Sequence, residues 1–115
     1  MYTVTHELLS AKVGEPVSIV FTVTDQNGSA VTLSGATAAY KIARGTGDTA
    51  LLTKTDGSGI TLSGNTATVA FNTNEVKNAQ DQQLYGEFLG QLKITKSGDS
   101  LYVAEGPLLI ERVIV

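Results

Sequence analysis

The sequence contains no cysteine, no tryptophan, one histidine and only two prolines among its 115 residues. Without cysteine the chain can form no disulfide and offers no thiolate ligand to a metal ion. The absence of tryptophan argues against a carbohydrate-binding surface, because sugars usually stack on exposed aromatic rings. The single histidine, His6, falls in a segment expected to be an edge strand. We therefore expect a surface histidine there and not a member of a Ser–His–Asp triad.

Charge and long apolar runs are also scarce. Eight basic and eleven acidic residues give a formal net charge of −3, and the basic residues form no cluster, so we expect no nucleic-acid partner. No apolar run approaches the about 20 residues that a membrane-spanning helix needs, so we expect no membrane partner. Residues 1–7 lack the basic and apolar regions of a signal peptide, which suggests folding in the cytoplasm where the chain is made.

The residues that are abundant indicate β-structure. Valine, threonine and serine are frequent, twelve glycines punctuate the chain, and strong helix signals are nearly absent. The length fits one domain spanning residues 1–115, with a core large enough to need no disulfide or metal ion for stability. We see no linker and no internal repeat.

Alternation with a period of two residues places the strands and their inward faces. In residues 16–24 the inward set is Val17, Ile19, Phe21 and Val23. The further positions predicted for the core are Tyr40, Ile42, Val69, Phe71, Phe88, Leu92 and Ile94. Residues 73–83 form the only helix-like stretch, where Thr73 is a candidate cap for one or two helical turns.

About eight short strands with turn signals about every 8–12 residues are typical of an antiparallel β-sandwich. We predict an all-β, immunoglobulin-like sandwich of 7–9 strands with one short helical turn. A closed barrel is the alternative. Residues 2–9 supply a first, edge-like strand, and residues 101–115 form a last strand that we expect to bend or bulge around Gly106 and Pro107, because proline cannot donate to a central ladder.

The loops contain no convincing ligand site. Asp25, Asn27 and Gly28 resemble the start of a calcium loop, but the third ligand and the bidentate glutamate are missing. Asn27-Gly-Ser29 matches a glycosylation pattern that has no use without a secretory route. The segments Gly45-Thr-Gly47 and Gly57-Ser-Gly59 are too short to cradle a phosphate. We expect no catalytic residue, no metal ligand and no cofactor, and hence no enzyme.

Apolar residues outside the predicted core are the candidates for a protein interface. Val20 and Leu89 lie on the outward phase of their strands, and Val113 and Val115 make the C-terminal end apolar. Tyr85 has two interpretations. It is either a contact residue or a corner residue whose hydroxyl ties down the preceding crossover, as in many immunoglobulin-like sandwiches.

Eight segments in order carry a resemblance to a known family. They are residues 13–21 (VGEPVSIVF), 23–28 (VTDQNG), 31–37 (VTLSGAT) and 40–42 (YKI), followed by the Leu51-Leu-Thr-Lys54, Gly59-Ile-Thr-Leu62, Tyr85-Gly-Glu87 and Gly106-Pro-Leu-Leu-Ile110 segments. This pattern resembles the immunoglobulin-like domains of tailed-bacteriophage and prophage structural proteins, notably the N-terminal domains of baseplate upper proteins. Ala30 stands where that family has proline.

The resemblance implies a non-enzymatic virion structural protein of a phage tail, baseplate, neck or capsid accessory layer. Its partners would be other virion structural proteins or further copies of itself, most simply in a homo-oligomer, and its location would be the virion. The alternative is a bacterial cell-surface adhesin or carbohydrate-binding β-sandwich module. A hydrolase is a third class, and it would need a cluster of titrating groups that this sequence barely offers.

Overall fold

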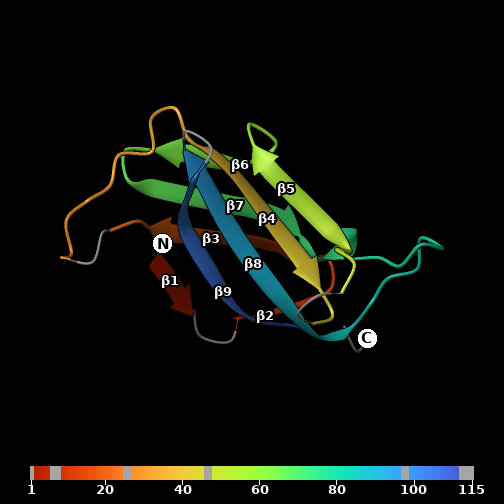
Figure 1. The fold of residues 1–115 in the computed structure, drawn as a ribbon. Helices are drawn as coiled ribbons and strands as arrows, with labels where there is room; N and C mark the ends of the chain where they lie inside the picture. The colour runs from red at the N-terminus through yellow and green to blue at the C-terminus, as the bar shows by residue number, and fades with distance from the viewer. Residues whose placement is uncertain (1, 6–8, 25–26, 46–47, 97–98, 112–115) are drawn as a thin grey trace.

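The computed structural model describes residues 2–5, 9–24, 27–45, 48–96 and 99–111, and for residues 2–5, 9 and 99–102 it describes the backbone alone. Nine strands and one short helical turn follow one another along the chain (Figure 1). They are β1 (Tyr2–Thr5), β2 (Leu9–Lys12), β3 (Pro16–Thr22), β4 (Thr37–Ala43), β5 (Leu52–Asp56), β6 (Gly59–Ser63), β7 (Thr66–Asn72), the 3-10 turn η1 (Thr73–Glu75), β8 (Gly86–Lys96) and β9 (Asp99–Glu111). The all-β prediction is confirmed.

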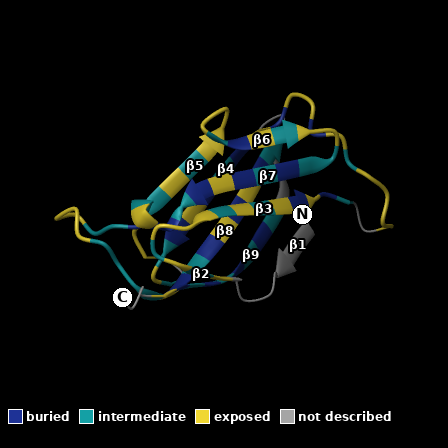
Figure 2. Cartoon of the chain, turned by 180° about the vertical axis from the view of Figure 1, so that it is seen from behind, coloured by how far each residue is buried: buried dark blue, intermediate teal, exposed yellow. Residues whose placement is uncertain are grey.

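The strands form one mixed sheet that folds over on itself. Its order is β1-β9-β8-β4-β5-β6-β7-β3, and β2 also pairs with β9. Strands β3, β6 and β7 lie behind β4, β8 and β9 in Figure 1, and the view from the other side in Figure 2 agrees. The result is a nearly closed, barrel-like shape with two layers around one core, in which β3 ends the sheet on one side and β1 and β2 end it on the other.

The expectation of a purely antiparallel sheet is wrong at three places. Strands β1 and β2 both run parallel to β9, and β5 runs parallel to β6 over two residue pairs. A period of two marks a strand but carries no information on its direction, so the sequence could not reveal these pairs. The β5–β6 pair arises where the chain turns between the layers, with Gly57 and Gly59 at positive φ values of 81° and 100°.

The last strand also differs from expectation. The register shift lies at Ile94 and Thr95 of β8, and β9 runs continuously past Pro107. The structure shows why proline is tolerated there. Strand β1 pairs with residues 102–105 and β2 with residues 108–111, so Pro107 falls between the two parallel ladders, where β8 is its one neighbour among the described residues.

The core follows the predicted alternation closely. Phe21, Tyr40 and Phe71 pack in a row at its centre, with ring centroids 6.3 Å apart for Phe21 and Tyr40 and 6.1 Å apart for Tyr40 and Phe71. The other predicted positions that are buried are Val23, Ile42, Val69, Phe88, Leu92 and Ile94. Val17 and Ile19 are only half-buried, because β3 is the terminal strand of its layer (Figure 2).

Gly90 gives Tyr40 the space that it occupies. A Cβ atom at position 90 would collide with the Tyr40 hydroxyl and would lie 2.7 Å from the Cζ atom of the same ring. The Tyr40 hydroxyl is buried and has no hydrogen-bond partner among the described residues. Burial raises the pKa of Tyr40 to about 12, since an ionised phenolate would be poorly solvated in the core.

The segment after β7 is tied to its surroundings by polar side chains. Asn72, and not Thr73 as expected, caps η1, and Glu75 completes a capping box by accepting a hydrogen bond from the Asn72 backbone at 2.7 Å. Thr73 is fully buried, and its hydroxyl donates to the carbonyl oxygen of Lys12 at 2.7 Å. Gln83 donates from its amide to the carbonyl oxygens of Thr73, Val76 and Leu84. These bonds hold the crossover against the start of β3.

Candidate interaction surfaces

Val20 lies in the middle of β3 on the outer side of its layer. Its side chain is 62% exposed, and it is the one large apolar side chain among the described residues that is exposed to solvent. Among the described strands β3 pairs with β7 alone, with Val20 opposite Thr68. The structure therefore places this predicted interface residue on an edge strand.

Leu89 lies on the outer side of the other layer, where it is half-buried. Its cross-strand neighbours are Pro107 on β9 and Ala43 on β4, so three apolar residues form a row across the face. A hollow of about 160 Å³ opens beside this row, next to Lys41, Asp48 and Gln91. We call the row Leu89, Pro107 and Ala43 the Leu89 row.

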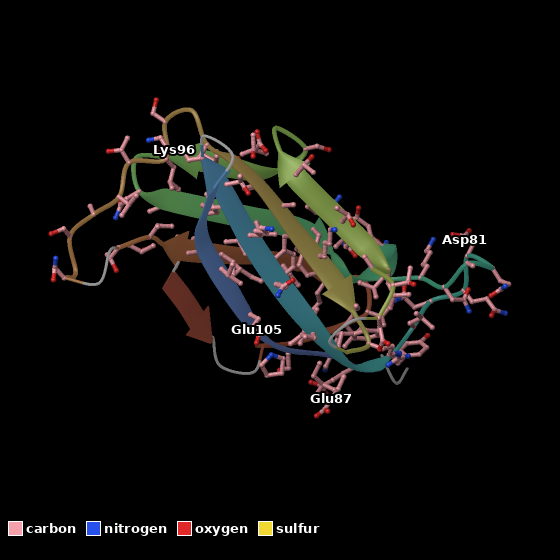
Figure 3. The ribbon with its side chains drawn as sticks, in the orientation of Figure 1. Asp81, Glu87, Lys96 and Glu105 are labelled. Carbon is pink, nitrogen blue, oxygen red and sulfur yellow. The ribbon has the colours of Figure 1, made fainter. Side chains whose placement is uncertain are left out.

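Charged residues flank the Leu89 row. On the next row along the strands, Gln91 lies between Glu105 on one side and Lys41 on the other, and its amide donates to Glu105 at 3.4 Å. Figure 3 shows Glu87 and Glu105 on the lower part of this face and Lys96 at the opposite end of β8. A polar rim around an apolar centre is typical of protein–protein interfaces.

Tyr85 lies directly before β8 and is half-buried. Its carbonyl oxygen accepts a hydrogen bond from Arg44 Nη1 at 2.9 Å, and the same nitrogen donates to the carbonyl oxygen of Glu87 at 3.3 Å. The Arg44 guanidinium lies over the Phe88 ring, 4.3 Å from its centroid. Gln83 also anchors the crossover before β8 through its bonds to backbone carbonyl oxygens, and both interpretations of Tyr85 stay predictions.

The predicted interface residues do not gather into one patch. Val20 and Leu89 project from opposite layers, away from the shared core, so they belong to two separate surfaces. Val113, Val115 and His6 lie outside the described residues. The sequence analysis did not identify Pro107, Arg44 or Gln83 as residues of these surfaces. The two-residue period of β9 could have placed Pro107 beside Leu89, whereas the contacts of Arg44 and Gln83 depend on long-range folding.

Polar side chains of β5 and η1 are bonded within the fold. Asp56 accepts a hydrogen bond from the Ala38 N–H at 2.9 Å, and Lys54 forms an ion pair with Glu75 at 2.8 Å. Hydrogen bonds from the Asn72 backbone and from Lys54 lower the pKa of Glu75. Within the described ranges no group of three or more His, Asp or Glu side chains could hold a metal ion, and no described helix is long and apolar enough to cross a membrane.

No family model matches the sequence, and comparison with curated proteins found no match.

Proposed function

We propose that this protein is a non-enzymatic structural subunit of a tailed-phage virion that acts in assembly through protein–protein contacts. The observation that carries the proposal is the Leu89 row, an apolar strip across β9, β8 and β4 with a charged and polar rim. Such a surface on the outer face of the sheet suits docking against a neighbouring structural subunit. The class of assembly comes from the sequence resemblance described above.

The order of the strands supports the immunoglobulin-like part of the proposal. Such sandwiches carry strands B, E and D in one layer and strands G, F and C in the other, and variable-type domains add C′ beside C. Here β3-β7-β6 corresponds to B-E-D, and β9-β8-β4-β5 corresponds to G-F-C-C′. The loop between β3 and β4 crosses between the layers, with Leu33 buried and Gly35 at a positive φ of 79°.

The proposal is tested by replacing Leu89 with glutamate. Purified native chain and the variant are mixed with the structural proteins encoded by neighbouring genes, and complexes are followed by sedimentation velocity. We expect Leu89→Glu to abolish complex formation, because a carboxylate would be desolvated at the centre of the apolar row. Thr61→Glu, on the exposed face of β6, is the matched control and should leave binding unchanged. Binding that survives Leu89→Glu would remove the Leu89 row from the proposal.

A further inference from the structure

We propose that β3 is a dimerisation edge, which pairs in antiparallel fashion with β3 of a second copy of this chain. The two copies would then share one continuous layer with the order β6-β7-β3-β3-β7-β6. The inference names the partner for one surface of the assembly role proposed above and rests on that role for its biological setting. The proposed dimer uses the outer edge of β3, which carries Val20, and not the Leu89 row.

The outer edge of β3 is open for pairing. Strand β3 ends the sheet order, and no described residue pairs with its second side. In an antiparallel pair, alternate residues direct their N–H and C=O groups away from the partner strand. These groups therefore form a ready template for another strand. In the immunoglobulin-like arrangement a strand A occupies this position, but the described N-terminal strands β1 and β2 pair with β9 instead.

Nothing on β3 protects this edge. Residues 16–22 carry no charge, and the register with β7 runs unbroken from Pro16 opposite Asn72 to Thr22 opposite Thr66. Proline stands only at the first position. Natural sheets usually guard an exposed edge with lysine, a bulge or a very short strand. The opposite end of this sheet has such guards, because β2 contains Lys12 and β1 spans only four residues.

One side chain on the outer side of the edge, Val20, is apolar where solvent would favour a polar one. Val20 is 62% exposed between Ser18 and Thr22. On the inner side, a hollow of about 260 Å³ opens between β3 and β2, where Val17 and Ile19 are half-buried. A strand added to β3 would cover Val20 on one side and this hollow on the other. Pairing would therefore bury apolar surface on both faces of the new strand.

The charge distribution permits pairing with a second copy and favours the antiparallel orientation. Each copy has a net charge of −3, but β3 itself is neutral, so two such edges meet without local repulsion. Glu15 is the nearest acidic residue. In an antiparallel pair centred on Ile19, the two copies of Glu15 lie roughly 26 Å apart at about 3.3 Å per residue. A parallel pair would bring the two carboxylates to neighbouring strands, where they would repel each other.

The absence of cysteine from the sequence makes the register directly measurable. Single-cysteine variants Ser18→Cys, Val20→Cys and Thr22→Cys are oxidised under dilute conditions, and disulfide dimers are quantified. In a two-fold antiparallel pair centred on Ile19, positions 18 and 20 lie equally close to the axis on the outer face and position 22 lies further away, so crosslinking should be higher for Ser18→Cys and Val20→Cys than for Thr22→Cys. Ala70→Cys, on the same outer face but one strand inward, should crosslink least.

Sedimentation velocity at micromolar concentration supplies the second readout. We expect a dimer of the native chain, and we expect Val20→Lys to raise its dissociation constant by roughly ten-fold or more, because like charges would face each other near the axis. Ala70→Lys is the matched control and should leave the dimer intact. Thermal unfolding of both variants checks that the fold persists, since both positions are exposed.

A native chain that stays monomeric, a dimer equally insensitive to both lysine variants, or uniform crosslinking at all four positions would each overturn the inference. A dimer that Leu89→Glu dissociates and Val20→Lys does not would also overturn it, while leaving the assembly role intact. Conversely, a β3-dependent dimer that binds no virion protein would contradict the proposed function and leave the dimer standing. The two proposals therefore fail in different experiments.

Discussion

Tyr40 places a hydroxyl in the centre of the core beside Gly90, with no hydrogen-bond partner among the described residues. Burying a hydroxyl without a hydrogen bond costs about 1–3 kcal/mol. We therefore expect the free energy of unfolding of Tyr40→Phe to equal that of the native chain or to exceed it by up to about 1–3 kcal/mol. Denaturant unfolding measures the difference. A loss of more than about 1 kcal/mol would show that the hydroxyl is hydrogen-bonded in solution.

The same contact makes Gly90 intolerant of substitution. Gly90→Ala forces a methyl group against the Tyr40 ring, and overpacking of this kind typically costs about 1–3 kcal/mol. Gly64→Ala is the steric contrast, because a Cβ there meets no atom within 4 Å and only its positive φ of 58° carries a cost. Equal stability of native chain and Gly90→Ala in a denaturant melt would mean that β8 and Tyr40 move apart easily.

Among the elements, the crossover after β7 gives a prediction about pH. Hydrogen bonds from the Asn72 backbone and from Lys54 lower the pKa of Glu75 below its ordinary value. A carboxyl group with a lowered pKa in the folded state stabilises the fold above its unfolded pKa, and this contribution disappears as the pH falls through the folded pKa.

The native chain should therefore lose stability on acidification below about pH 4.5, and Glu75→Gln should lose less. At neutral pH the variant should be the less stable of the two, and the difference should shrink toward zero in acid. Thermal melts across this range measure both trends. Glu87→Gln is the control on an exposed position. A stability gap that stays constant with pH would show that Glu75 contributes through shape and not through charge.

The elements also show which features of the fold can be predicted from the sequence. The inward faces of β4, β7 and β8 were predicted correctly, because burial on one side imposes an alternation that local sequence records. The parallel pairing of β1 and β2 with β9 was not predicted, because it joins residues from opposite ends of the chain. Pro107 illustrates the same limit. Local sequence indicated a bulge, whereas the gap between two ladders accommodates the proline without one.

The candidate surfaces were predicted only as individual residues. The outward phases of Val20 and Leu89 followed from strand alternation, and the structure places both on outer faces. Their separation onto opposite layers depends on how the sheet folds over at β5 and β6, which no local pattern reports. The open edge of β3 is likewise a property of the sheet order, since an edge strand and a central strand can share the same sequence alternation.

In the whole molecule the two proposed contact surfaces, the Leu89 row and the β3 edge, lie on opposite layers of one small β-domain. A subunit with two independent surfaces can join a second copy through one and a different protein through the other. This arrangement suits a repeated component of a symmetric particle.

The most direct test of the assembly role is quantitative mass spectrometry of purified phage particles from a strain that carries this gene. We expect the chain to be present in fixed proportion to the known tail and capsid proteins. If the subunits also assemble through the β3 edge, the copy number per particle should be even. Particles that form normally and contain none of this chain would contradict the proposed function.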